Sequence, residues 1–148
     1  MFSLHEIDEK MLKYIDYENG FFIECGANDG ITQSNTAFLE KAKQWLADTF
    51  DQNTQVQVQK LLDNNTADLV ESFYKDLEFG TGGMRGIVGP GTNRINKYTL
   101  GKATQGLSNY LHKVIDDKII KVAIGYDCRN DSKWLAKTVA DVLSANNI

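Results

Sequence analysis

The chain has 148 residues, the length of one ordinary domain, and 42% of its residues are hydrophobic, which is enough to build a core. Sixteen basic residues against twenty acidic ones leave a formal net charge of −4. The basic residues are scattered and form no stripe that could follow a phosphate backbone, so the composition argues against a nucleic-acid partner.

The first twenty residues carry charges throughout and contain no apolar core or small-residue cleavage site, which argues against a secretory signal. No apolar run approaches the roughly 20 residues that cross a bilayer. We therefore expect a cytoplasmic protein with no membrane span. The two cysteines, Cys25 and Cys128, lie far apart without CxxC spacing, so we expect reduced packing thiols.

Two elements are expected at the front of the chain. Apolar residues at helical spacing predict an amphipathic helix over residues 1–19. The run "FFIECG" then predicts a short buried strand over 21–26, which ends in the glycine turn "ANDG".

Two more helices are expected before the glycine-rich part of the chain. The first runs from about residue 36 to residue 50, with one apolar face that consists of Phe38, Leu39, Ala42, Trp45, Leu46 and Phe50. The second spans residues 66–79, with Asn65 or Thr66 as its N-cap.

The stretch "FGTGGMRGIVGPGTN", residues 79–93, has six glycines in the twelve positions from Gly80 to Gly91. Glycine costs roughly 0.5–1 kcal/mol relative to alanine inside regular structure, so such a cluster is typical of a loop whose backbone must bend sharply or be approached closely. We expect an irregular loop there.

Behind this loop the pattern becomes helix, strand, turn, helix. A helix is expected over 99–114, with an inward stripe of Leu100, Ala103, Leu107, Tyr110, Leu111 and Val114. The β-branched run "KIIKVAIGY", 118–126, is typical of a strand covered on both faces in a parallel sheet. The turn "DCRNDS" leads into a last helix with Trp134, Leu135, Val139, Val142 and Leu143 on its stripe. This order predicts an α/β fold, and with one long strand we expect its sheet to be incomplete.

Ligands of such sheets gather at the carboxyl ends of the strands and at helix N-termini. Two loops qualify, and each offers one arginine amid small residues. The first contains Thr81 and Arg85, and the second contains Asp127 and Arg129.

Neither common nucleotide motif is present. A Walker A loop would need a glycine where Asn96 stands and a Ser or Thr where Ala103 stands. The dinucleotide fingerprint fails because Arg85 occupies the place of its third glycine. What remains suits a phosphate, since exposed N–H groups can form a nest and a guanidinium binds two phosphoryl oxygens at once. The alternative is a solvent-exposed connector whose Arg85 pairs with Glu78 or Asp76.

Three motifs in order carry a family resemblance: F-G-T-x-G-x-R-G from residue 79, N-x-Y-T-x-G-x-A-T-Q-G from residue 96 and G-x-D-x-R-x-x-S from residue 125. From about residue 41 to 148 the chain resembles the N-terminal domain of the α-D-phosphohexomutases, the phosphoglucomutase and phosphomannomutase-like enzymes. The resemblance implies an incomplete three-layer αβα domain I, with a partial mixed or parallel sheet and flanking helices.

The resemblance also implies an activity. These enzymes move a phosphoryl group between the 1- and 6-positions of a hexose through a bisphosphorylated intermediate and a phosphoserine near Mg²⁺. By this likeness Arg85 is the catalytic-site arginine, which assists proton transfer or the phosphoserine environment. By the same likeness Thr81, Gly82 and Gly83 belong to the loop packed beside the phosphoserine, and Asp127 and Arg129 match a turn that supports the same site.

Two motifs of that family are missing. There is no S-H-N-P serine loop, because the histidines are His5 and His112 and the only proline is Pro90. There is no D-x-D-x-D metal loop either. We therefore expect the chain by itself to have no mutase activity.

A second resemblance lies in "GFFIECGANDGITQSNTAFLE", residues 20–40, which is similar to the S-adenosylmethionine-binding segment of FkbM-type methyltransferases. The matching positions are Glu24, Gly26, Asn28, Asp29 and Gly30. In a methyltransferase a second strand that ends in an acidic residue should follow, but residues 41–50 have a helical pattern instead. We expect a methyltransferase-like fragment over 1–40 and a truncated mutase domain I over 41–148, two truncated reading frames joined near residue 40 as in a fusion, an assembly artefact or a degraded gene. The other possibilities are an S-adenosylmethionine-dependent methyltransferase fragment and a non-catalytic fusion or truncated product.

Overall fold

The computed structural model describes residues 37–64, 67–116 and 119–148. The chain divides into two compact units, Met1–Arg94 and Ile95–Ile148, which are described separately. The helix expected over 1–19, the strand over 21–26 and the N-cap at residue 65 or 66 lie outside the described residues. Across the described ranges, no helix is long and apolar enough to span a membrane.

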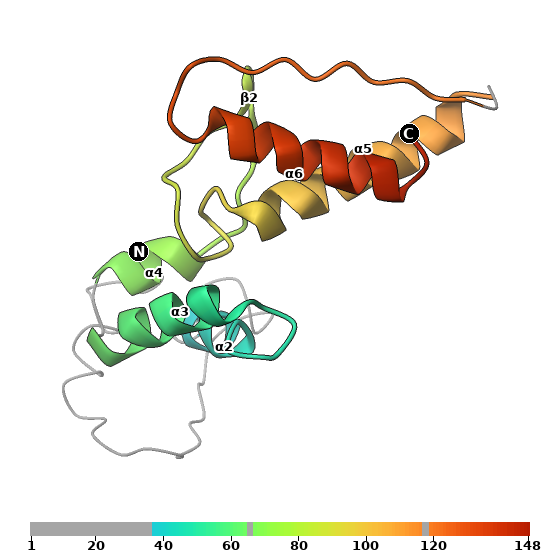
Figure 1. The fold of residues 1–148 in the computed structure, drawn as a ribbon. Coiled ribbons are helices and arrows are strands. Elements are labelled where there is room, and N and C mark those ends of the chain that lie inside the picture. Colours follow the sequence, from blue (N-terminus) through green and yellow to red (C-terminus); the bar gives the residue numbers. More distant parts are fainter. Residues whose placement is uncertain (1–36, 65–66, 117–118) are drawn as a thin grey trace. The chain divides into compact units, whose positions relative to one another are not determined.

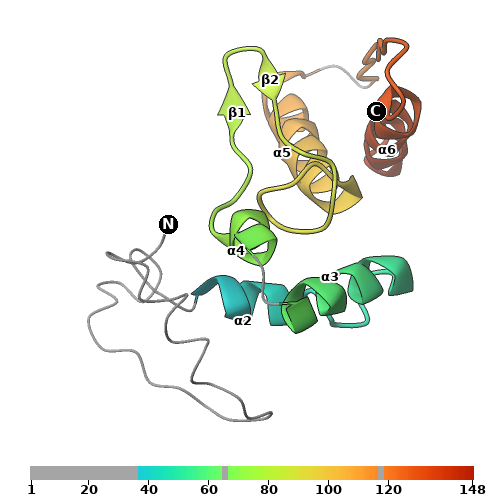
Figure 2. The same ribbon diagram turned by 90° about the vertical axis from the view of Figure 1, so that its left-hand side faces the viewer.

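Among the described residues, the first unit contains three short helices, α2 (Ala37–Gln44), α3 (Gln52–Asn64) and α4 (Ala67–Phe73) (Figures 1 and 2). Helix α2 contacts both α3 and α4, and α3 contacts α4. Burial of apolar side chains where the three meet is the main force that holds such short helices. The buried apolar residues of this unit are Phe38, Ala42, Trp45, Val58, Leu69 and Phe73.

The helix expected up to residue 50 is wrong in its extent, because α2 ends at Gln44. Trp45 folds back in the following turn and stacks on Phe50, with ring centroids 4.6 Å apart, and meets Phe73 edge-on at 5.7 Å. Asp51 then starts α3, since its carboxylate accepts hydrogen bonds from the Thr54 N–H and hydroxyl. The predicted core position of Trp45 is confirmed.

Helix α4 is also shorter than expected and ends at Phe73. The carbonyls at its end accept hydrogen bonds from a distant segment: Ser72 O from the Asn93 N–H at 2.9 Å and Lys75 O from the Thr92 hydroxyl at 2.6 Å. Carbonyls used in this way no longer need a continuing helix, so the chain leaves the helical path.

Residues 79–84, expected as an irregular loop, form a hairpin. Strands β1 (Phe79–Gly80) and β2 (Gly83–Met84) pair antiparallel with Phe79 opposite Met84 and Gly80 opposite Gly83 (Figure 2). In the part of the chain that the structure describes, this is the only sheet.

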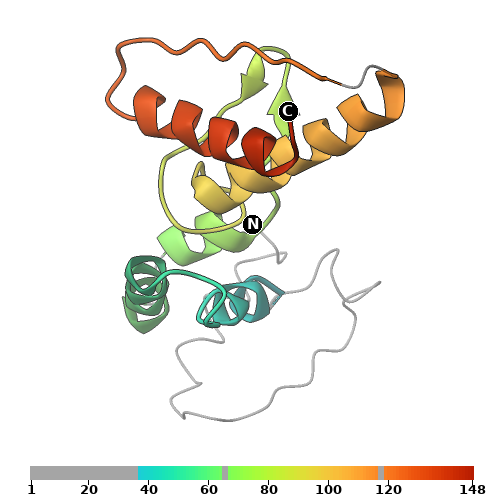
Figure 3. The same cartoon turned by 45° about the vertical axis from the view of Figure 1, so that its right-hand side comes forward.

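The second unit contains α5 (Lys97–Val114) and α6 (Ser132–Ala145), so both expected helices are confirmed. They lie side by side and run in the same direction (Figures 1 and 3). The pairing agrees: Gly101 lies beside Val142, and one turn later Gln105 and Asn146 exchange two side-chain hydrogen bonds of 2.8 and 2.9 Å. Two parallel helices need a long return connection, which residues 115–131 supply.

The strand expected over 118–126 is wrong for its described part, residues 119–126. This stretch has no strand partner, and none of its backbone groups forms a hydrogen bond with the described residues. A strand exists only through pairing, so the β-branched sequence alone did not produce one. The expected parallel sheet is thus not formed in the described part of the chain.

The face that α5 buries also differs from the expectation. Its buried side chains are Thr104 and Ser108, whose hydroxyls donate to the carbonyls four residues earlier at 2.8 and 3.0 Å. Three residues of the expected inward stripe are exposed: Leu107, Tyr110 and Val114. No sheet in the described part of the chain covers the apolar stripe.

Candidate functional site

The first expected ligand loop is the hairpin β1–β2. Thr81 and Gly82 form its two-residue turn, and Gly83 starts β2 with a φ of 107°, a left-handed conformation that favours glycine. A Cβ added to Gly82 or Gly83 would meet no other atom within 4 Å. The backbone of this turn is therefore open to an approaching molecule.

Arg85 follows β2 directly and is exposed. It forms no hydrogen bond or ion pair with the residues that the structure describes. The pairing with Glu78 or Asp76 that would make Arg85 part of a plain connector is thus not formed, and the Asp76 carboxylate lies 3.8 Å from the Lys41 ammonium group. No group among residues 37–64, 67–116 and 119–148 occupies the guanidinium of Arg85.

The glycine-rich segment is closed at its base. The Leu77 N–H donates to the Thr92 carbonyl at 2.8 Å, and the Thr92 hydroxyl donates to the Lys75 carbonyl at 2.6 Å. Gly91 has a φ of 123°, and a Cβ there would lie only 2.4 Å from the Ser72 carbonyl oxygen. Only glycine lets the segment return this close to α4.

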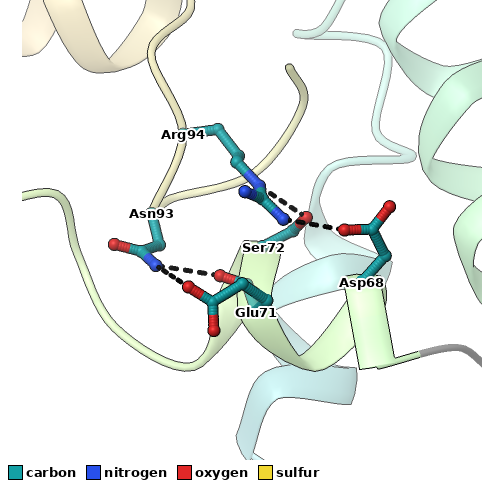
Figure 4. A network of polar contacts seen from close by, with 5 residues as sticks. All are labelled: Asp68, Glu71, Ser72, Asn93 and Arg94. Carbon is teal, nitrogen blue, oxygen red and sulfur yellow. Dashed lines mark hydrogen bonds and ion pairs between the residues drawn. The ribbon is translucent and has the colours of Figure 1, made fainter. Parts of the chain in front are cut away.

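Beyond Gly91, two side chains fasten the chain to α4 (Figure 4). The Arg94 guanidinium donates from Nε to the Ser72 hydroxyl at 3.1 Å and from Nη2 to the Asp68 carboxylate at 3.0 Å. The Asn93 amide donates to the Glu71 carbonyl at 2.9 Å and to its carboxylate at 3.4 Å. We call these five residues the α4 clamp.

A cleft of about 230 Å³ lies beside the clamp, between α3, α4 and residues 87–90. Its ionisable lining residues are Lys60, Asp68 and Arg94, and Arg85 does not line it. The cleft and the Arg85 hairpin are therefore separate features of the first unit.

The second expected ligand loop belongs to the second unit and is tightly organised around Asp127. The Asp127 carboxylate accepts hydrogen bonds from the Arg129 N–H at 3.1 Å, from Arg129 Nε at 2.8 Å and from the Ser132 hydroxyl at 2.5 Å. Arg129 Nη2 also lies 2.8 Å from this carboxylate. Cys128, between them, is a free thiol but is exposed, so the prediction of a packing thiol is wrong for Cys128.

These contacts change the acidity of the loop. The Arg129 side chain first, then the Ser132 hydroxyl and the Arg129 backbone N–H, hold the pKa of Asp127 well below its ordinary value. The pKa of Arg129 is raised by the same carboxylate. Arg129 is thus oriented by Asp127, although its side chain remains 84% exposed.

The expected site residues fall into three groups. Thr81, Gly82, Gly83 and Arg85 are brought together by the hairpin, and Asp127 and Arg129 by their turn, each set inside its own unit. The residues expected to bind S-adenosylmethionine lie outside the described residues: Glu24, Gly26, Asn28, Asp29 and Gly30.

Within the described ranges, no three His, Cys, Asp or Glu side chains cluster so that they could hold a metal ion. The described donor groups therefore do not fit the Mg²⁺ that the family resemblance implies.

Comparison with known proteins identifies the class of the second half of the chain. Residues 76–148 match the family model "Phosphoglucomutase/phosphomannomutase, alpha/beta/alpha domain I". Over these residues the chain is similar to domain I of the phosphohexomutases. The segment holds both expected ligand loops and both helices of the second unit.

Phosphoglucomutases of Staphylococcus aureus strains MRSA252, USA300 and NCTC 8325 are each 40% identical to this chain over 78 residues. The match covers 53% of this chain and 14% of the length of each of these relatives. No solved structure matches the chain. The boundary expected near residue 40 stays a prediction.

The sequence reasoning missed the α4 clamp and the cleft. Both depend on contacts between residues 22–26 positions apart, of which no local motif gives a sign. Arginine side chains are usually exposed, so no sequence pattern led us to expect a buried Arg94 at a binding site.

Proposed function

We propose that the glycine-rich segment receives the phosphoryl group of a hexose phosphate, as part of a phosphohexomutase domain I that works in the cytoplasm. Arg85 supplies the guanidinium that binds the phosphoryl oxygens and serves as the catalytic-site arginine. Thr81 and the N–H groups of Gly82 and Gly83 complete the loop around it. This role is supported by one observation above all, that Arg85 stands exposed beside an open glycine turn with no partner among the described residues.

The chemistry suits the groups present. Phosphoryl transfer requires positioning and charge compensation, which an arginine and backbone N–H groups supply. A guanidinium binds two phosphoryl oxygens through parallel N–H donors, a geometry that an ammonium group cannot reproduce.

Asp127 and Arg129 are proposed to form a second phosphate-binding loop, within the second unit. The contacts of Arg129 with Asp127 hold its guanidinium in one orientation while most of its surface stays in solvent. An arginine oriented in advance loses less freedom when an anion binds.

The chain by itself is proposed to be inactive. Its sequence contains neither the serine loop nor the metal loop of the family. No step through Mg²⁺ can be assigned to the described residues. A coupled assay with the purified 148-residue chain should detect no interconversion of glucose 1-phosphate and glucose 6-phosphate, and measurable turnover would refute this part of the proposal.

Binding is tested separately from turnover. A ¹H–¹⁵N NMR titration with inorganic phosphate and with glucose 6-phosphate should move the amide signals of Gly82, Gly83 and Arg85. Arg85→Gln should abolish the shifts and Arg85→Lys should weaken them, whereas Lys113→Gln, on an exposed turn of α5, should leave them unchanged. Stationary hairpin signals in the unmodified chain would rule the proposal out.

Methyl transfer stays a prediction for residues 20–40, because no contact among the described residues tests it. Calorimetry with S-adenosylmethionine decides it: heat of binding that Asp29→Ala removes supports the methyltransferase-like interpretation, and the absence of such heat refutes it.

A further inference from the structure

The cleft between α3, α4 and residues 87–90 is a second feature of the first unit with the chemistry of a binding site. Two of its three walls, α3 and α4, precede residue 76 and so lie outside the segment that matches the mutase family. The cleft is therefore not explained by the function proposed for the hairpin.

The charges of the cleft are unbalanced towards the positive. Its ionisable residues are two cations, Lys60 and Arg94, and one carboxylate, Asp68. The chain as a whole carries a net charge of −4, so this local excess of positive charge is not a general property of its surface. With Arg94 paired to Asp68, the excess positive charge is that of Lys60, and such an excess attracts anions to the cleft.

Arg94 and Asp68 are unequally buried. The Arg94 side chain is 6% exposed, whereas the Asp68 carboxylate that pairs with it is 71% exposed. A buried charge is costly unless it is compensated, and here one of the groups that compensate Arg94, the Asp68 carboxylate, stands largely in water. An anion from solution can replace or join Asp68 as a partner of the Arg94 guanidinium. The Asp68 carboxylate is already largely hydrated, so it loses little when its ion pair with Arg94 breaks.

The remaining lining limits what kind of anion fits. Pro90 and Ile87 add apolar surface, and Asn64 adds an amide. The volume of about 230 Å³ is below the roughly 300–1,000 Å³ of sites for drug-sized ligands. A ligand with one anionic group and a short carbon body matches both the charge and the apolar wall.

We propose that this cleft binds a small organic anion, a carboxylate or a phosphate monoester, whose charged group lies between Arg94 and Lys60 and competes with Asp68.

NMR titrations of the full chain with glycerol 3-phosphate, butyrate and inorganic phosphate test this proposal. At least one of the two organic anions should shift the amide signals of Ser72 and Gly89 saturably, and more tightly than inorganic phosphate, which has no carbon body. Glycerol 3-phosphate and butyrate separate a phosphate ligand from a carboxylate. If neither shifts these signals saturably, or if inorganic phosphate binds at least as tightly, the proposal fails.

Two variants sharpen the test without removing Arg94, on which the fold depends. Lys60→Gln should weaken binding about threefold, the effect expected from the loss of one exposed charge, while Lys43→Gln on α2 should have no effect. Asp68→Asn should tighten binding, because the competing carboxylate is gone. A purely structural role for Asp68 predicts no gain in affinity, so unchanged or weaker binding by Asp68→Asn would overturn the proposal.

The outcome is independent of the function proposed for the hairpin. Shifts of Gly82, Gly83 and Arg85 with stationary Ser72 and Gly89 refute the cleft proposal alone. The reverse pattern refutes phosphate binding at the hairpin and leaves the cleft.

Discussion

Arg94 donates its Nε hydrogen to the Ser72 hydroxyl at 3.1 Å, which joins two buried side chains that lie 22 residues apart. The bond closes the loop that carries the hairpin and the candidate phosphate-binding arginine. The position of that loop thus depends on α4, an element that precedes the segment shared with the phosphohexomutases.

Ser72→Ala should destabilise the first unit by about 1–3 kcal/mol, because it leaves the buried Nε of Arg94 without this acceptor. The backbone bond from Asn93 to the Ser72 carbonyl is unaffected by the substitution. Urea unfolding followed by Trp45 fluorescence, in a Trp134→Phe background, measures the change. Ser144→Ala, at an exposed position of α6, is the matched control. Equal stability of the two variants would show that the bond contributes nothing.

Gly91→Ala should cost about 2 kcal/mol or more, since alanine would be strained at a φ of 123° and its Cβ would lie 2.4 Å from the Ser72 carbonyl oxygen. Gly89→Ala is the control, because a Cβ there meets nothing within 4 Å. The same fluorescence measurement compares them. If both variants unfold at the same urea concentration, the close approach of Gly91 to α4 is not maintained in solution.

Asn96→Ala should destabilise the second unit by about 1 kcal/mol, the usual cost of losing an N-cap. The Asn96 side chain accepts hydrogen bonds from the Tyr98 and Thr99 N–H groups at 3.1 and 2.9 Å, and the Thr99 hydroxyl accepts one from the Asn96 N–H. Asn96→Asp keeps the acceptor and adds favourable charge at the helix N-terminus, so it should retain stability. Thermal unfolding followed by circular dichroism distinguishes the two, and equal losses would contradict capping.

The pKa of Asp127 in the folded chain should lie below its ordinary value of 3.8. A depressed folded-state pKa means that the contribution of this carboxylate to stability is complete above 3.8 and is lost as the pH falls below that value. The pH dependence of the side-chain carboxyl ¹³C signal gives the pKa directly. Arg129→Gln should raise it most, and Ser132→Ala less. An Asp127 that titrates at 3.8 in the unmodified chain would contradict the contacts described.

The two helices of the second unit could be predicted from the sequence because their causes are local. Apolar residues at three- and four-residue spacing mark both, and at the start of α5 the N-cap Asn96 stands three residues before Thr99. Helix α3 was missed because Val56 and Val58 alternate with glutamines, a pattern that resembles a strand. The candidate phosphate-binding residues were also found locally, since the glycines and Arg85 follow one another in the chain.

Local patterns in the sequence predicted where α5 and α6 form, marked the glycine-rich segment as a bend, and carry the resemblance of residues 76–148 to the phosphohexomutases. Three features became visible only in the folded chain: α4 stops at Phe73, Arg94 is buried against Ser72 and Asp68, and residues 119–126 form no strand. The reason is physical: helix spacing and capping act within a few residues, whereas strand pairing, burial of a charge and the closure of a cleft need partners that are distant along the chain.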